Sequence, residues 1–173
     1  RYRMVSAIVY LFFCFFVNAQ VLTFKDVYQK DIKVGAERPE MYLSKLANKK
    51  VAICANQTSF INKTHIVDSL ISLNVNVVKV FSPEHGFRGE VEAGKTVNTA
   101  KDAKTNLPIV SLYGKNKKPT ADDMKGIDVV IFDIQDVGAR FYTYISTMHY
   151  MMEACSENNV EFIVLDRPNP NGY

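Results

Sequence analysis

IDVVIFDI, residues 127–134, is the stretch that decides the fold class of this 173-residue chain. It is a short, largely apolar run, and Gly126 stands directly before it. A run of this kind is typical of a strand that is buried on both faces. Such strands occur in parallel sheets whose two faces are covered by helices. The flanking sequence must then supply helices and further strands in alternation.

Helical and strand patterns do alternate on both sides of this run. Residues 120–126, TADDMKG, predict a helix that Thr120 caps and Gly126 ends. Residues 140–159 predict a long helix whose apolar stripe holds Phe141, Tyr144, Ile145, Met148, Met151, Met152 and Cys155. Other strands are expected at residues 50–56, 75–81, 108–114 and 161–166, and other helices at residues 64–73 and around Met41, Leu43 and Leu46. The alternation predicts an α/β fold with a mostly parallel sheet and helices on both faces.

The N-terminal residues have the pattern of a secretory signal. Arg1 and Arg3 precede an apolar stretch of about a dozen residues, and Ala19 offers a small residue for cleavage. The stretch is short for a membrane anchor, which requires about 20 apolar residues. We therefore expect residues 1–19 to be a cleaved signal peptide and the mature chain to be secreted or periplasmic, with no stable membrane anchor after cleavage.

The charge of the chain and its cysteine and histidine content argue against nucleic-acid binding and against a metal site. Removal of Arg1 and Arg3 lowers the formal net charge from +3 to +1, because two positive side chains are lost, and nothing favours nucleic-acid binding. Cys54 lies in a strand pattern and Cys155 on a helix face. Two buried thiols are favoured there over the disulfide that an exported chain permits. No spacing of Cys and His predicts a metal site, and no cofactor is expected.

Polar side chains gather directly after four of the predicted strands. Ligands of open parallel sheets bind beyond the carboxyl ends of the strands, so these groups are expected to share one site. They are Asn56, Gln57 and Thr58 after the first strand; Ser82, Glu84, His85 and Arg88 after the second; Asp133, Gln135, Asp136 and Arg140 at the fourth; and Asp166, Arg167 and Asn169 at the last. Glycine-rich phosphate motifs and a Gly-x-Ser-x-Gly elbow are absent from the sequence. Carboxylates, amides and arginines suit a sugar or another polyhydroxylated ligand.

Glu84 is the candidate acid or base of this site. Pro83 and Gly86 bound its loop, and burial would raise its pKa so that it could donate a proton near neutral pH. An ion pair with Arg88 that only supports the loop competes with this role. A purely structural role competes likewise for His85.

The fourth strand and the long helix carry further candidates. Asp133 and Asp136 are candidate second carboxylates, although Asp133 could equally tether a loop. Arg140 lies at the start of the long helix, where exposed backbone donors favour an anion. Tyr142 could stack on a sugar ring, whereas Tyr144 is expected to pack in the core. The histidines His65 and His149 are expected to be packing or surface residues.

Several uncommon motifs, taken in order, resemble a known family. They are NQTS (56–59), FSPEHGFRGE (81–90), AGKTV (93–97), DAKTNLPIVSLYG (102–114), the long run 118–154 and VLDRPNPNG (164–172). They are similar to the secreted exo-β-N-acetylmuramidases of the NamZ type, formerly a domain of unknown function. The likeness covers about residues 46–173. It implies a Rossmann-like catalytic domain there, preceded by an N-terminal extension at residues 20–45 and followed by a second domain that this sequence does not include.

The resemblance also implies a reaction and a set of site residues. It implies an enzyme that releases terminal non-reducing N-acetylmuramic acid from peptidoglycan fragments, so peptidoglycan-derived muramic acid saccharides are the expected partner. Glu84 matches the family's catalytic glutamate, and His85 and Asp136 are expected to be catalytic with it. The residues expected to bind the substrate are Asn56, Gln57, Arg88, Asp133, Gln135, Arg140, Tyr142, Asp166, Arg167 and Asn169.

Three questions of mechanism and function stay open at this point. Arg88, Arg140 or Arg167 could select the lactyl carboxylate of muramic acid. Retention, inversion and assistance by the N-acetyl group of the substrate are all compatible with the sequence, which fixes no partner for Glu84. Two other functions also remain: a cell-wall carbohydrate-binding module without catalysis, and another cell-wall hydrolase such as an amidase or deacetylase.

Overall fold

The computed structural model describes residues 32–83, 86–88 and 100–171, and residues 33–173 form one compact unit. The expected signal peptide lies outside the described residues. The described elements are η1 (Gly35–Glu37), α3 (Pro39–Leu46), β1 (Val51–Ala55), β2 (Phe60–Ile61), β3 (Thr64–His65), α4 (Ile66–Ser72), β4 (Val77–Ser82), β5 (Ala100–Lys101), β6 (Pro108–Ser111), α5 (Ala121–Met124), β7 (Val129–Asp133), α6 (Tyr144–Glu157) and β8 (Glu161–Val164).

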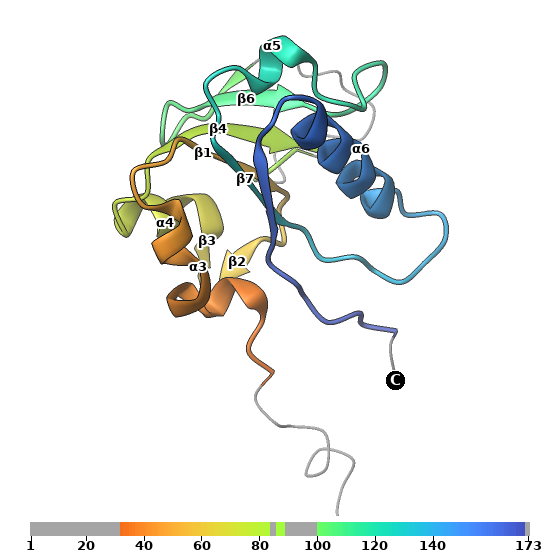
Figure 1. Cartoon of the computed structure of the whole chain (residues 1–173). Coiled ribbons are helices and arrows are strands. Elements are labelled where there is room, and N and C mark those ends of the chain that lie inside the picture. Colours follow the sequence, from red (N-terminus) through yellow and green to blue (C-terminus); the bar gives the residue numbers. More distant parts are fainter. Residues whose placement is uncertain (1–31, 84–85, 89–99, 172–173) are drawn as a thin grey trace, which may run out of the picture. The chain divides into compact units, whose positions relative to one another are not determined.

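A six-stranded sheet in the order β5-β6-β4-β1-β7-β8 forms the centre of the unit (Figure 1). The neighbours from β6 to β8 all run parallel, and β5 alone pairs antiparallel, with β6. β1 lies between β4 and β7, and Val51 is opposite Val77 on one side and Val129 on the other. The predicted mostly parallel α/β sheet is therefore confirmed.

Helices cover both faces of this sheet. Val51, Ile53 and Ala55 of β1 point to one face and pack in a core with residues of α3 and α4. Ala52 and Cys54 point to the other face, where the core includes residues of α5 and α6. All five side chains are fully buried, as a strand covered on both faces requires. Figure 1 shows the same division, with α3 and α4 on one side of the sheet and α6 on the other.

The long helix α6 differs from its predicted pattern. It begins at Tyr144 instead of residue 140, and its buried residues include Thr147 and Ala154. Phe141 is 83% exposed, and Ile145 and Met152 are also exposed, so three members of the expected apolar stripe lie outside the core. The buried face therefore includes Thr147 and Ala154, which the apolar stripe did not, together with Tyr144, Met151 and Cys155, which it did. In α3, likewise, Tyr42 and Leu46 are buried whereas Met41 is exposed.

Other local expectations are confirmed. Thr120 caps α5, because its Oγ1 accepts from Asp123 N at 3.2 Å and Asp123 Oδ2 accepts from Thr120 N at 2.9 Å. Cys54 and Cys155 are free, buried thiols, and burial raises the pKa of both. Within the part of the chain that is described, no helix is long and apolar enough to cross a membrane.

Candidate functional site

The carboxyl ends of β4, β1, β7 and β8 meet at one edge of the sheet, because these four neighbours run parallel. The segments that follow them carry the polar residues singled out in the sequence. Glu84 and His85 lie outside the described residues, but the residues on either side of them, Pro83 and Gly86, are described. This edge is therefore the place where the candidate site can be examined.

The turn after β1 is organised by Asn56. Its Oδ1 accepts from Thr58 N at 2.9 Å and from Thr58 Oγ1 at 2.7 Å, which is an Asx turn. The backbone donor fixes which end of the amide is oxygen, so Nδ2 points away from this turn. Asn56 is fully buried, and its Nδ2 has no hydrogen-bond partner among the described residues. A buried donor without an acceptor is costly, and a ligand oxygen would satisfy it.

Asp133 and Arg167 form a buried ion pair between the ends of β7 and β8. Arg167 Nε lies 2.5 Å from Asp133 Oδ1 and its NH2 lies 2.9 Å from Oδ2. The same NH2 donates to Phe60 O at 2.9 Å, and Ser59 Oγ donates to Asp133 O. Asp133 is completely buried, and burial raises the pKa of its carboxyl although Arg167 opposes the shift. Both residues therefore tie the strand ends together.

The loops after β7 and β8 pack against each other. Gln135 Nε2 donates to Pro168 O, and Asn171 Nδ2 donates to Val137 O at 2.6 Å. Gly138 has a φ of 66° and lies so close to Asn169 that a Cβ at this position would clash with its side chain. Gln135 and Asn169 therefore serve, at least in part, to join the two loops.

Four predicted site residues stand at the surface of this edge. Asp136 and Arg140 are exposed, and Asp136 Oδ2 accepts from Gly138 N at 3.2 Å. Asp166 is exposed as well, and its backbone oxygen accepts from Gly35 N at 2.7 Å. Tyr142 is 43% exposed, and its ring lies between the neighbouring aromatic rings at centroid distances of 5.5 and 5.9 Å. These side chains remain accessible to a ligand.

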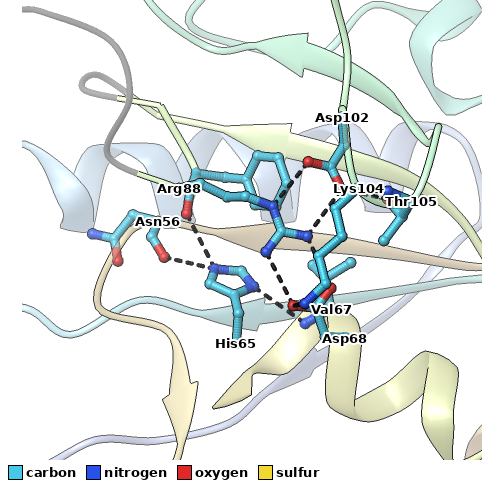
Figure 2. A network of polar contacts seen from close by, with 9 residues as sticks. Asn56, His65, Val67, Asp68, Arg88, Asp102, Lys104 and Thr105 are labelled. Carbon is cyan, nitrogen blue, oxygen red and sulfur yellow. Dashed lines mark hydrogen bonds and ion pairs between the residues drawn. The ribbon is translucent and has the colours of Figure 1, made fainter. Parts of the chain in front are cut away.

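Arg88 is held by two carboxylates from different parts of the fold (Figure 2). Its Nε and NH2 donate to Asp102 at 2.8 and 2.9 Å, and its NH2 and NH1 donate to Asp68 at 2.9 and 3.1 Å. The hydrogen bonds that Arg88 donates to Asp102 and Asp68 raise the pKa of its guanidinium. Four of its five N–H donors are thus used inside the chain. Sequence reasoning did not identify Asp68 or Asp102.

His65 connects the turn after β1 with the segment after Glu84 and His85. Its Nδ1 accepts from Val67 N at 3.3 Å and caps α4, so the proton is on Nε2. Nε2 then donates to Asn56 O at 3.0 Å and to Phe87 O at 3.1 Å. His65 is buried and packs edge-on against Phe60 and Phe87, which confirms the expected packing role. The other predicted packing or surface histidine, His149, is exposed.

We expect His65 to make stability depend on pH. Burial lowers its pKa from the ordinary value of 6.5. The stability that neutral His65 contributes is therefore complete above pH 6.5 and is lost as the pH falls through that value toward the lowered pKa. Urea unfolding between pH 7.5 and 5 should show this slope, and His65→Asn, which keeps a capping acceptor, should flatten it. His149→Asn is the matched control and should leave the slope unchanged; equal slopes in all three proteins would contradict the assignment.

A hollow of about 370 Å³ lies beside this group of residues. Gln57 contributes to its wall, and the Oε1 of this residue is buried without a hydrogen-bond partner in the described part of the chain. Residues from the β2–β3 hairpin, α4, the segment around Arg88 and the loop between β5 and β6 complete the wall; they are Phe60, Lys63, Thr64, His65, Asp68, Arg88 and Lys104. No group of three or more His, Cys, Asp or Glu side chains suited to a metal occurs among the described residues.

Comparison with known proteins shows the family to which the chain belongs. A family model described as "Exo-beta-N-acetylmuramidase NamZ, N-terminal" matches residues 51–173, which include every segment described above from β1 onward. The chain belongs to this family. It is 46% identical over 135 residues to the peptidoglycan β-N-acetylmuramidase NamZ of Bacillus subtilis, a match that covers 76% of this chain and 32% of that protein.

Solved structures support the same relation. Two DUF1343-family proteins from Bacteroides fragilis are 46% and 48% identical to the chain, with TM-scores of 0.69 and 0.72. Each match covers 80% of this chain and 35% of the solved protein. The chain thus spans about a third of the length of the relatives it matches, and it corresponds to the N-terminal part of the NamZ family.

Proposed function

We propose that the protein carrying this chain is a glycoside hydrolase that releases terminal non-reducing N-acetylmuramic acid from peptidoglycan fragments. The observation that carries the proposal is the match of residues 51–173 to the N-terminal part of the NamZ family. The convergence of four strand ends at one edge supports it, because this is where ligands of open parallel sheets bind. With residues 1–19 as a cleaved signal peptide, the reaction takes place outside the cytoplasm.

We assign Glu84 as the general acid and base, with His85 and Asp136 as its catalytic neighbours. A carboxyl group beside the glycosidic oxygen can protonate the leaving group, and in a two-step reaction with retention it then accepts a proton from the water that attacks the sugar. Around it, the residues assigned to the substrate are Asn56, Gln57, Arg88, Asp133, Gln135, Arg140, Tyr142, Asp166, Arg167 and Asn169. Some of these side chains are exposed at this end of the sheet, whereas others hold the strand ends and loops through hydrogen bonds within the chain.

The arginines differ in what they can offer a substrate. Arg88 and Arg167 each bind carboxylates of the chain in a bidentate manner. Arg140 is exposed in the loop that precedes α6, four residues before the helix begins at Tyr144, and Tyr142 is exposed in the same loop. We therefore assign Arg140 to the lactyl carboxylate that distinguishes muramic acid from glucosamine, and Tyr142 to the face of the sugar ring.

A turnover assay on the full-length gene product tests this function. We expect release of nitrophenol from the 4-nitrophenyl glycoside of N-acetylmuramic acid and little or none from the matching N-acetylglucosamine glycoside. Binding of the muramic acid compound without release would indicate a carbohydrate-binding module instead. Loss of activity on chelation, with release of acetate or peptide in place of sugar, would indicate a deacetylase or amidase.

The free Nδ2 of Asn56 gives a second, finer test. Asn56→Asp keeps the oxygen that accepts from Thr58, and it replaces the Nδ2 donor, which has no partner among the described residues, by an acidic oxygen. If this donor binds a substrate oxygen, kcat/KM should fall about 10–100-fold, because a buried hydrogen bond is lost. Asn62→Asp, in the exposed β2–β3 turn, is the matched control and should keep normal kinetics. Unchanged kcat/KM in a folded Asn56→Asp protein would remove Asn56 from the substrate site.

A further inference from the structure

The carboxylate of Asp102 is held in place by contacts other than those with Arg88. Its Oδ2 accepts from Thr105 N at 3.0 Å and from Thr105 Oγ1 at 2.5 Å. The backbone on both sides is also paired, because Asp102 N donates to Leu107 O at 2.9 Å and Asn106 N donates to Asp102 O at 2.8 Å. Asp102 is buried at the side of the sheet formed by β5 and β6. It therefore presents a rigid acceptor to Arg88.

Asp68 approaches Arg88 from a different element. It lies in the first turn of α4, and its Oδ2 also accepts from Lys104 Nζ at 2.8 Å. Figure 2 shows the guanidinium of Arg88 between the two carboxylates, with Lys104 on the outer side. Two negative and two positive side chains thus form a neutral group. We call Arg88, Asp68 and Asp102 the Arg88 clamp.

The two carboxylates and the guanidinium of the clamp are each ionised at neutral pH, because every pKa shift in the clamp favours the charged form. Burial alone would raise the pKa of Asp102, but hydrogen bonds from Arg88 and Thr105 outweigh it and hold this pKa well below its usual range. Hydrogen bonds from Arg88 lower the pKa of Asp68 as well. The side chain of Arg88 is only 18% exposed, so these ion pairs are weakly screened by solvent.

The clamp acts on the chain directly after Glu84 and His85. Arg88 is the last of three consecutive residues that are each held: Gly86 N donates to Pro83 O at 3.3 Å, and Phe87 O accepts from His65 Nε2 at 3.1 Å. The ring of Phe87 is also buried in the core. Pro83 in turn follows Ser82, whose backbone oxygen accepts from Leu112 N at 2.8 Å. The described residues on both sides of Glu84 and His85 are thereby joined to each other and to the sheet.

We propose that Asp68 and Asp102 are positioning residues of the glycosidase: by holding Arg88 they fix residues 86–88, and so fix where the chain delivers Glu84. This inference rests on the proposed function, in which Glu84 is the general acid and base. Asp68 and Asp102 touch no reacting atom in this scheme. Their effect is on the rate of the chemical step, because a displacement of about 1 Å at a reacting group can cost about 100-fold in rate.

Neutralising either carboxylate tests the proposal in the full-length gene product. In Asp102→Asn and Asp68→Asn, we expect kcat to fall about 10–100-fold while KM changes less than about threefold. Arg88→Lys should lower kcat similarly, because an ammonium group cannot replace a planar guanidinium that bonds two carboxylates. Kinetics are measured well below the midpoint of thermal unfolding of each variant. Normal kcat in the folded variants, or a rise in KM with unchanged kcat, would overturn the proposal.

The matched control is an ion pair at the opposite end of the strands. Glu161, at the amino end of β8, accepts from Lys49 Nζ at 2.5 Å, and Glu161→Gln should leave both kcat and KM unchanged. Glu84→Gln separates this inference from the proposed function. If Glu84→Gln retains normal turnover, the glycosidase function stands but Glu84 is not its general acid and base, and the positioning proposal fails with that assignment; if it is inactive while Asp68→Asn and Asp102→Asn turn over normally, only the positioning role fails.

Discussion

Glu84→Gln is expected to lower kcat by about 1,000-fold or more while the fold is retained. The amide has almost the same shape as the carboxyl group but can neither give nor take a proton in this range of pH. Positioned acid–base groups contribute about 100- to 10,000-fold to such reactions, and one residue here would serve both steps. The measurement is the initial rate of N-acetylmuramic acid release by the full-length gene product, with circular dichroism to verify folding.

The leaving group makes this test specific for an acid. Nitrophenolate departs without much help, whereas the alcohol of a second sugar needs a proton as the bond breaks. The loss in Glu84→Gln should therefore be larger on a disaccharide than on the nitrophenyl glycoside. Glu157, at the end of α6, has an exposed carboxylate that pairs with Lys118 Nζ at 2.6 Å. Glu157→Gln is the control and should behave as the native protein on both substrates. Equal losses on the two substrates would mean that Glu84 does not act as the acid.

Most of the fold could be predicted because the sheet strands are short apolar runs. A strand covered on both faces needs apolar side chains at successive positions, and β1 and β7 have them. The helix faces were less predictable. In α6, Thr147 and Ala154 are buried together with Met151, whereas Ile145 and Met152 are exposed, because they lie on a face of the helix that the core does not cover. Periodicity reports where apolar residues lie, and packing decides which of them are covered.

The position of the site at the carboxyl ends of the strands could be predicted, but the ion-pair partners of its charged residues could not. Parallel topology alone brings Asn56, Asp133 and Arg167 to one end of the sheet. The ion pairs join residues 14, 20 and 34 positions apart, and no local pattern in the sequence encodes such contacts. Asp68 lies among the polar residues of a predicted amphipathic helix, where nothing distinguishes it from a solvent-exposed side chain. The position of His65 directly before a predicted helix was a usable signal, because the residue before a helix often caps it.

Arg167→Met should produce the largest loss of stability, about 3–5 kcal/mol in the free energy of unfolding. The substitution leaves the carboxylate of Asp133 buried without its counter-ion, in a place that water does not reach. Urea unfolding of the native and variant proteins gives the difference directly. Asp133→Leu combined with Arg167→Met removes both charges and should cost much less than Arg167→Met alone, because no unpaired buried charge remains. A single-variant loss below about 1 kcal/mol, as surface ion pairs give, would contradict this view of the pair.

The pH dependence of that loss identifies its cause. Burial already raises the pKa of Asp133 in the native chain, and removal of Arg167 must raise it further. The part of the loss that comes from the buried charge is therefore complete above the variant's pKa, and it disappears as the pH falls below the native pKa of Asp133. Lost packing of the Arg167 side chain would not depend on pH. A deficit that narrows toward acid pH thus shows an unpaired carboxylate, and a constant deficit would show that Arg167 acts by filling space.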